Sequence, residues 1–306
     1  MILITGATGF LGSELVYQLL ENGARVRAIK REGSAIPKIL QGKPVEWVTA
    51  DILDHFALEA AFEGVRQVYH CAGMISFKSA DRKRLHQVNA EGTANVVNLC
   101  LENNIGKLVH VSSVAAIGEG KPGQAVTEKD LLEYTGLQHG YSISKYEGEM
   151  EVWRGIAEGL TAVIVNPAVI IGRAAGDKGS GRIFETARRG TSFYTGGSIG
   201  LIAVADVARV MIALMNSDIS GQRFILNAGT LSIKELFTQA AAIFGNRAPS
   251  ILVRPWMLKL ALVNRSVVHS LTKQHLYSTE KINEALPGIV FRPVSEVVNE
   301  TCIELV

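Results

Sequence analysis

The amino-acid sequence predicts an α/β protein whose core is a doubly wound parallel sheet, with helices on both faces and a smaller C-terminal cap. Three observations lead to this class. Short β-rich apolar runs alternate with helix-length amphipathic segments, a glycine-rich turn directly follows the first run, and the alternation loosens after Pro167. Strands that alternate with helices build βαβ units, in which parallel strands lie side by side with a helix layer on each face.

The first part of the chain carries the repeated strand and helix pattern. Longer amphipathic segments predict helices over residues 10–23, 55–62, 82–104 and 139–158. Apolar, β-rich runs predict strands over residues 2–5, 25–29, 45–49, 67–71, 107–111 and 161–165. Strands with helical connections in this number are typical of a Rossmann domain, which we expect over residues 1–167.

The second part of the chain has a looser pattern. A glycine-rich stretch over residues 172–181 is followed by a short strand at 201–204, a helix at 207–215, a strand near 223–227 and mostly helical segments up to Val306. We expect residues 168–306 to form mainly a substrate-binding cap over the carboxyl edge of the sheet. Some of its segments, such as residues 201–227, are expected to return to the first domain.

The composition excludes several classes of partner. The 31 Lys and Arg residues nearly balance the 29 Asp and Glu residues, so no polyanion such as nucleic acid is indicated. The three cysteines lack C-x-x-C spacing, which disfavours a disulfide framework or a metal site and predicts free thiols in a reducing compartment. Every long apolar stretch is interrupted before the ~18 residues that span a bilayer, and the N-terminus lacks a signal-peptide pattern. We therefore expect a cytoplasmic protein with no membrane partner and no metal.

A glycine-rich loop follows the first strand and opens the first helix. Its glycines, Gly6, Gly9 and Gly12, have the spacing G-x-x-G-x-x-G, with Ala7, Thr8, Phe10 and Leu11 between them. Glycine permits a tight turn and lets backbone N–H groups approach a pyrophosphate at a helix N-terminus, where the helix dipole favours negative charge. At the head of a βαβ series this loop predicts dinucleotide binding rather than a structural turn.

Two cations end the second strand. An NAD-preferring site usually offers an acidic residue there, which binds the adenosine ribose hydroxyls. Lys30 and Arg31 instead suit a 2′-phosphate. The sequence therefore predicts NADP as the cofactor, with NAD as the alternative if the two cations only decorate the strand end.

Three side chains form a candidate catalytic group. Tyr141 and Lys145 are four residues apart at the start of a predicted helix, so they lie on one face of it. A fixed ammonium beside a phenol lowers its pKa from the ordinary value of about 10, and such a phenol can exchange a proton with a substrate oxygen. Ser112 and Ser113 follow the fifth strand and place hydroxyls at the carboxyl edge of the sheet, where open α/β folds bind ligands.

A known family has the same motifs in the same order and spacing as the loop glycines, Ser113, Tyr141 and Lys145. The chain thus resembles the extended branch of the short-chain dehydrogenases/reductases, which is also called the NAD-dependent epimerase/dehydratase superfamily. The resemblance covers nearly the whole chain, through the pair Asp51-Ile52, the segment from His70 to Gly73 and the segment from Asn89 to Thr93. It implies that Ser113, rather than Ser112, polarises the substrate carbonyl, that Tyr141 is the acid/base, and that Lys145 also holds the nicotinamide ribose. The implied cofactor-binding residues are Gly6, Thr8, Gly9, Phe10, Leu11, Gly12, Lys30, Arg31, Asp51, Ile52, Ala72, Gly73, Tyr141, Lys145, Pro167 and Val169.

Within this superfamily the chain is most similar to dihydroflavonol-4-reductases and 3β-hydroxysteroid dehydrogenases. Asn166-Pro167 after the sixth strand resembles that group, and Ser113 is followed by Val114-Ala115-Ala116 rather than by the acidic pair of sugar-nucleotide dehydratases. The candidate substrate-binding residues are Met74, Phe77, Ser113, Asn166 and Phe193. We therefore expect an oxidoreductase that reduces a carbonyl, or oxidises the alcohol, of a hydrophobic small molecule.

Two other functions stay open. Arginines of the second part, Arg182, Arg188, Arg189 and Arg209, could clamp a diphosphate, which would favour a nucleotide-sugar epimerase. A cofactor-binding regulator without catalysis is the alternative of another class, against which the intact Tyr141, Lys145 and Ser113 argue. The expected partner is a small-molecule substrate, and a homodimer is compatible with the sequence.

Overall fold

The computed structural model describes residues 1–305 apart from 122, 137, 174–178 and 261–264. Part of the glycine-rich stretch predicted at 172–181 therefore lies outside the described residues. The central sheet contains seven strands, which are β1 (Ile2–Thr5), β2 (Val26–Lys30), β3 (Glu46–Thr49), β4 (Gln67–His70), β5 (Lys107–Val111), β6 (Ala162–Pro167) and β10 (Gln222–Leu226). The helices around it are α1 (Phe10–Glu21), α2 (His55–Ala61), α3 (Arg82–His86), α4 (Gly92–Glu102), α5 (Gly140–Ala157) and α7 (Val204–Met215).

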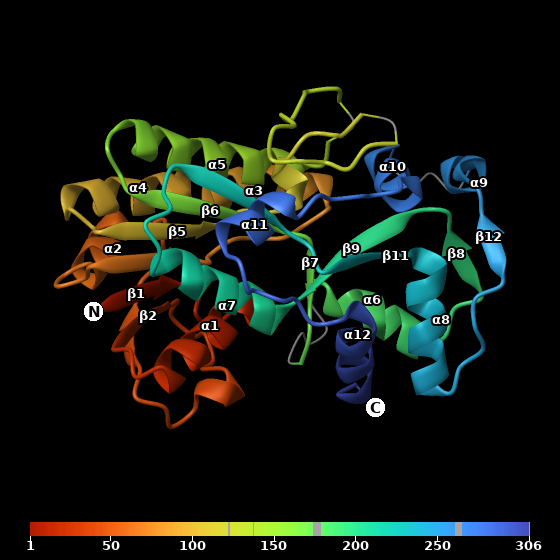
Figure 1. Ribbon diagram of the computed structural model, residues 1–306, viewed down its shortest axis with the longest axis horizontal. Helices are drawn as coiled ribbons and strands as arrows, with labels where there is room; N and C mark the ends of the chain where they lie inside the picture. Colours follow the sequence, from red (N-terminus) through yellow and green to blue (C-terminus); the bar gives the residue numbers. More distant parts are fainter. Residues whose placement is uncertain (122, 137, 174–178, 261–264, 306) are drawn as a thin grey trace.

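The seven strands are parallel and lie in the order β10-β6-β5-β4-β1-β2-β3. Chain order reverses between β1 and β4, which is the switch point where open α/β sheets bind ligands. Figure 1 shows α1 and α7 on one face of the sheet and α2, α3, α4 and α5 on the other. Each face buries its own apolar core, so the predicted doubly wound fold is confirmed.

The remaining elements form the cap at the carboxyl side of the sheet (Figure 1). Its strands are β7 (Val169–Ile171), β8 (Phe193–Thr195), β9 (Ser198–Ala203), β11 (Gly229–Ser232) and β12 (Ile251–Val253). Its helices are α6 (Gly181–Arg188), α8 (Ile233–Phe244), α9 (Pro255–Leu260), α10 (Arg265–Thr272) and α12 (Val294–Ile303), whereas α11 (Glu280–Ala285) packs against β10 of the central sheet. Strands β11, β9 and β7 make one sheet, β12 and β8 another, and side chains of α6, α8 and α12 pack in a third apolar core.

Several predicted elements differ from the observed ones. The helix expected over 82–104 is divided into α3, a π-helical segment Gln87–Glu91 and α4. The π-helical segment contains Asn89, whose side chain hydrogen-bonds the backbone of Met74. The region after Pro167 also contains more strands than expected, because three- and four-residue strands such as β8, β11 and β12 carry too few residues for a period-2 pattern.

Three later segments, β10, α7 and α11, adjoin the first part of the chain. Strand β10 pairs with β6 and so extends the central sheet, and α7 packs against α1. The division of the chain into a cofactor domain and a substrate cap stays a prediction. None of the helices in the described ranges is long and apolar enough to cross a membrane.

Candidate active site

The glycine-rich loop is too tightly packed for side chains at two of its glycines. Gly6 has φ +70°, and a Cβ there would lie 2.5 Å from the backbone nitrogen of Ala72. A Cβ on Gly12 would lie 2.2 Å from the carbonyl oxygen of Gly6. The loop is also closed by a hydrogen bond from the Gly9 N–H to the same oxygen, at 2.9 Å. Glycine is therefore required here for the turn and for the close packing of helix against strand.

The first turn of α1 leaves its N–H groups available. Gly9 is the N-cap residue and supplies no side-chain hydrogen bond, and the turn contains no acidic residue. The helix has 12 residues and begins at the switch point of the sheet. Such an N-terminus binds anionic groups through free N–H donors and the helix dipole. The loop therefore fits the pyrophosphate of a dinucleotide.

A chain of buried hydrogen bonds joins β1, β4 and α4 beside this loop. The side chain of Thr93 donates to the Asn89 carbonyl at 2.7 Å, so its oxygen can accept from Nε2 of His70, 3.0 Å away. The neutral ring then accepts at Nδ1 from the Thr5 hydroxyl at 2.6 Å, and Thr5 in turn accepts from the Ala72 N–H. Burial lowers the pKa of His70 to about 3, with a smaller contribution from the charge of Lys145. His70 is thus a neutral structural residue.

The segment from Ala72 to Met74 lies between this chain and α5. Asn89 holds the segment, because its side chain accepts from the Met74 N–H at 2.7 Å and donates to the Met74 carbonyl at 2.9 Å. A Cβ on Gly73 would lie 3.3 Å from Oδ1 of Asn89 and 3.7 Å from Nζ of Lys145. The structure therefore brings the predicted residues Ala72, Gly73 and Lys145 together.

The other predicted cofactor residues lie at the ends of neighbouring strands. Asp51 and Ile52 follow β3, where Oδ1 of Asp51 accepts from the Leu53 N–H at 3.0 Å and Ile52 is buried. Lys30 ends β2 and is half-buried, and Arg31 is exposed next to it. Pro167 ends β6, and Val169 begins β7 two residues later.

Ser113 and Tyr141 meet at the carboxyl edge of the sheet. Ser113 follows β5 in an extended conformation, and its hydroxyl oxygen accepts from the Ala115 N–H at 3.1 Å, which caps a short 3-10 helix. Tyr141 lies in the first turn of α5, and the Ser113 side chain lies near enough to its phenol to favour the charged form of that phenol. The neighbouring Ser112 is buried and bonds elsewhere. Of the two serines, Ser113 is therefore the one that the structure places beside the phenol.

Lys145 is buried one turn further along α5. Its ammonium donates to the Val111 carbonyl at 2.7 Å. Burial lowers the pKa of Lys145 to about 8, while the nearby charge of Glu149 raises it. A pKa in this range makes Lys145 partly neutral in mildly alkaline solution, unlike an ordinary surface lysine.

The pKa of the phenol differs from the expected direction. The helical spacing of Tyr141 and Lys145 predicts a lowered phenol pKa, but burial raises it, and the nearby Ser113 side chain only partly offsets this. The ammonium of Lys145 is directed to the Val111 carbonyl instead. Tyr141 therefore holds its proton at neutral pH.

An aromatic rim borders Tyr141. The Phe77 ring makes edge-to-face contacts with the rings of His139 and Tyr141, at centroid distances of 5.4 and 6.0 Å. Phe77 is 61% exposed, so most of its surface is free to contact another molecule. Large exposed apolar groups beside a polar site are typical of ligand pockets for hydrophobic compounds.

Two predicted substrate-binding residues lie elsewhere. Asn166 is fully buried, and its side-chain N–H groups bind the Ser113 carbonyl and the Glu149 carboxylate, so we reassign it to supporting Ser113. Phe193 lies on β8, which pairs only with β12 among the described strands. Figure 1 places β8 at the outer end of the cap, away from the start of α5. The structure therefore does not bring Phe193 together with Tyr141.

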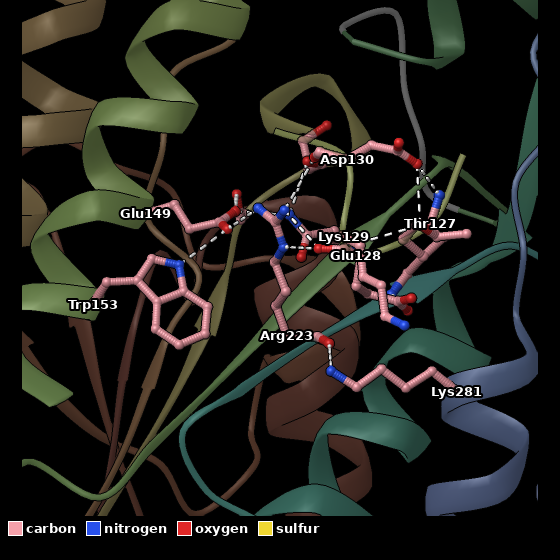
Figure 2. A network of polar contacts seen from close by, with 12 residues as sticks. Thr127, Glu128, Lys129, Asp130, Glu149, Trp153, Arg223 and Lys281 are labelled. Atoms are coloured by element: carbon pink, nitrogen blue, oxygen red, sulfur yellow. Dashed lines mark hydrogen bonds and ion pairs between the residues drawn. The ribbon is translucent and has the colours of Figure 1, made fainter. Parts of the chain in front are cut away.

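The sequence interpretation missed a buried ion pair beneath the site, between Glu149 and Arg223 (Figure 2). The local sequence does not single out Glu149, because residues 139–158 are rich in Glu and Lys and such positions usually face solvent. The available signal was its spacing, since Tyr141, Lys145 and Glu149 recur every four residues on one helix face. Among the described residues, no cluster of His, Cys, Asp and Glu is placed to hold a metal ion.

A comparison with known protein families agrees with this geometry. Residues 2–229 match the NAD dependent epimerase/dehydratase family. The chain belongs to this family. The resemblance seen in its loop glycines, Ser113, Tyr141 and Lys145 is therefore confirmed at the level of the family.

Individual relatives carry reductase and sterol-related names. A putative dihydroflavonol 4-reductase from Synechocystis sp. is 34% identical over 276 residues, which cover 87% of this chain and 79% of the relative. Sterol demethylase protein B from Methylococcus capsulatus is 29% identical over 270 residues, 84% of this chain and 78% of the relative. The crystal structure of gox2253 superposes with a TM-score of 0.90 at 27% identity and covers 100% of this chain and 97% of its own.

Proposed function

We propose that this protein is an NADPH-dependent reductase of hydrophobic ketones or aldehydes, in which Tyr141 donates the proton and Ser113 binds the carbonyl oxygen. The observation that carries the proposal is the approach of the Ser113 side chain to the Tyr141 phenol at the carboxyl edge of the sheet, with buried Lys145 one turn along α5. The glycine-rich loop and the N-terminus of α1 would hold the pyrophosphate of the cofactor.

The chain's own residues account for the proton chemistry. The bound nicotinamide supplies a hydride to the carbonyl carbon. The O–H of Tyr141, which is protonated at neutral pH, donates its proton to the oxygen. The Ser113 hydroxyl donates a second hydrogen bond, which stabilises charge as it develops on the oxygen. The ammonium of Lys145, one turn further along α5, donates to the Val111 carbonyl and adds positive charge to the site in which the phenolate would form.

Two cations support a preference for NADPH over NADH. Lys30 and Arg31 follow one another at the end of β2, beside the glycine-rich loop in the sheet order. In the described part of the chain, neither side chain makes an ion pair or hydrogen bond with a protein group. Both are therefore available to a 2′-phosphate, which binds strongly to such cations.

The surroundings of Tyr141 favour a hydrophobic substrate. Phe77 presents an exposed ring next to the phenol, and the named relatives include a dihydroflavonol 4-reductase and a sterol demethylase protein. The arginines that could clamp a diphosphate are mostly engaged. Arg188 and Arg189 both pair with Glu185, and Arg209 pairs with Asp206. These arginines could pair with the diphosphate of a nucleotide sugar only after leaving their carboxylate partners. Without such pairing, the removal of the diphosphate from water is not compensated.

The proposal includes a cytoplasmic location. Cys71, Cys100 and Cys302 are free cysteines, as expected in a reducing compartment, where disulfides are rare. A homodimer stays a prediction from the sequence.

The variant Tyr141→Phe tests the catalytic assignment. It removes the proton donor and leaves the phosphate-binding loop intact, so we expect turnover to fall by about 100-fold or more while the affinity for NADPH is unchanged. Substrates would first be found by screening aryl ketones, flavonoids, steroids and nucleotide sugars for NADPH consumption and thermal stabilisation. Near-normal turnover of the variant would remove Tyr141 from the mechanism, and epimerisation of a nucleotide sugar would replace the reductase with an epimerase.

The cofactor preference is tested by titrating NADPH and NADH into the wild-type protein and Arg31→Ala. We expect NADPH to bind more tightly, and Arg31→Ala to weaken NADPH binding by about 10-fold, the loss of one charge-assisted contact, with little change for NADH. The matched control is Arg25→Ala, at the other end of the same strand. A preference for NADH, or equal effects of both variants, would contradict the assignment.

A further inference from the structure

One buried carboxylate, Glu149, receives four hydrogen bonds beneath the proposed active site. Its Oε2 accepts from the Ser112 hydroxyl at 2.7 Å and from the Asn166 amide at 2.8 Å. Its Oε1 accepts from Nη1 of Arg223 at 2.7 Å and from the Trp153 indole at 3.3 Å. Figure 2 shows the last two donors converging on the carboxylate. Glu149 is fully buried, so this charge depends entirely on protein donors.

These bonds join α5 to three neighbouring strands of the central sheet, β5, β6 and β10. Ser112 follows β5, Asn166 lies in β6, Arg223 lies in β10, and Glu149 itself lies in α5. The same Asn166 amide also donates to the Ser113 carbonyl at 3.0 Å. Glu149 therefore fixes the helix that carries Tyr141 and Lys145 relative to the strand ends that carry Ser113.

Arg223 extends the support to the segment that follows Ser113. Its guanidinium donates to the Glu128 carbonyl at 3.0 and 2.7 Å and to the Asp130 carbonyl at 3.2 Å (Figure 2). The Asp130 carbonyl also accepts from the Gly118 N–H. The Lys281 ammonium donates to the backbone carbonyl of Arg223 at 2.9 Å. The ion pair is thus the centre of a network rather than an isolated contact.

Glu149 is also the main negative charge near Lys145. The groups that face this ammonium are Cys71, His70 and His110 from the sheet and Glu149 from the helix. Both histidines are neutral, because burial and the charge of Lys145 lower the pKa of each. Burial raises the pKa of Cys71 to about 12, so its thiol is also neutral. Glu149 therefore remains as the charge that raises the pKa of Lys145 and so counteracts the effect of burial.

We propose that Glu149 is a positioning residue of the proposed reductase, which holds Ser113 against Tyr141 and keeps Lys145 in its ammonium form. The kinetic consequence of this inference rests on the proposed function. Its two structural consequences, the placement of Ser113 against Tyr141 and the ammonium form of Lys145, can be measured without substrate. A carboxylate is required because all four partners donate hydrogen bonds, whereas a carboxamide would direct its own N–H groups at two of them.

The test compares Glu149→Gln with Glu151→Gln, which removes the same charge from a partly exposed position on the same helix. Lysine labelled with ¹³C at Cε and tyrosine labelled at Cζ would report Lys145 and Tyr141 by NMR, assigned with Lys145→Met and Tyr141→Phe. In Glu149→Gln we expect the Lys145 pKa to fall by about one unit from the wild-type value and the Tyr141 signal to shift, because an opposite charge is lost. Glu151→Gln should change neither. An unchanged Lys145 pKa in Glu149→Gln would overturn the proposal.

Kinetics provide the second measurement. Glu149→Gln should lower kcat by at least ~10-fold with little change in KM, because misplacement of a reacting group affects the transition state more than binding. Equal kcat in Glu149→Gln and wild type would overturn the positioning role. Inactivity of the wild-type protein toward every substrate would instead contradict the proposed function, and the NMR measurements would still decide the structural part.

A double variant separates positioning from folding if Glu149→Gln does not fold. Glu149→Met combined with Arg223→Met replaces the buried pair with apolar side chains, an exchange that proteins often tolerate. We expect the double variant to fold and still to show the lower Lys145 pKa and the lower kcat. Wild-type values for both would show that the pair has only a structural role.

Discussion

The adjacent residues Ser112 and Ser113 belong to two regions of the sheet edge that use polar groups in opposite ways. Ser112 is buried and belongs to a support region, in which Glu149 is surrounded by protein donors. Ser113 belongs to a reacting region with Tyr141 and Lys145, where the side chains make few bonds to the protein. Buried polar groups must be satisfied within the fold, whereas reacting groups need free hydrogen-bonding capacity for ligands. One strand end supplies both, because successive residues of a strand point to opposite sides.

The largest expected effect is on the free energy of unfolding, when the buried ion pair between Glu149 and Arg223 is compared with the partly exposed ion pairs of Arg154. Arg223→Met leaves the Glu149 carboxylate buried without its partner, which should lower the free energy of unfolding by about 3–5 kcal/mol. The matched change Arg154→Met breaks two partly exposed ion pairs, with Glu151 and Glu158, and a hydrogen bond to Asn98, and should cost about 1 kcal/mol. Urea unfolding measures both. Similar losses in the two variants would mean that the support region is no more than a set of surface-like ion pairs.

The two serines should separate activity from stability. Ser113→Ala removes a hydrogen-bond donor to the carbonyl oxygen, so we expect kcat to fall by about 100-fold with stability nearly unchanged. Ser112→Ala removes a hydrogen bond to a buried carboxylate and should mainly lower the free energy of unfolding, by about 1.5–3 kcal/mol. Steady-state kinetics and thermal unfolding of both variants check this pair. A larger loss of kcat in Ser112→Ala would reverse the assignment of the two regions.

The smallest expected effect is a pH dependence of stability from Lys145. Burial lowers its pKa in the folded protein to about 8, from an ordinary value of 10.5. Between these values the unfolded chain binds the proton that the folded protein releases, so the free energy of unfolding rises with pH in this window. Relative to Lys145→Met, the wild-type protein should gain about 2 kcal/mol between pH 8 and pH 10. A flat difference between the two unfolding curves would show that Lys145 titrates like an exposed lysine.

The Rossmann part of the fold could be predicted from the sequence because its strands and helices are long enough to show their periodicity. The helix predicted over 139–158 is observed as α5, Gly140–Ala157, and the loop glycines lie where the spacing places them. The cap could not be predicted in the same detail. Its three-residue strands β7, β8 and β12 are defined by pairing with distant partners, which no local pattern encodes.

The candidate site was predictable in its reacting groups and not in its support. Ser113, Tyr141 and Lys145 follow from strand ends and helix spacing; the structure places Ser113 beside Tyr141, whereas the Lys145 ammonium donates to the Val111 carbonyl. Glu149 and Asn166 could not be assigned from local sequence, because a glutamate on a charged helix and an asparagine at a strand end are usually exposed. Only the tertiary contacts with Arg223 and Ser113 show that they are buried for a structural reason. The direction of the Tyr141 pKa was wrong for the same reason, since burial is a tertiary property.

Net hydride transfer to a hydrophobic carbonyl compound is the central claim, and isotope transfer tests it most directly. The protein would be incubated with NADPH that carries deuterium at its transferable position and with a ketone found in the substrate screen. Mass spectrometry and NMR would then locate deuterium in the product. The account predicts one deuterium on the carbinol carbon of the alcohol, with one NADPH consumed for each product molecule and almost no product from Tyr141→Phe. No deuterium in any ketone product, together with interconversion of a nucleotide sugar without net loss of cofactor, would contradict it.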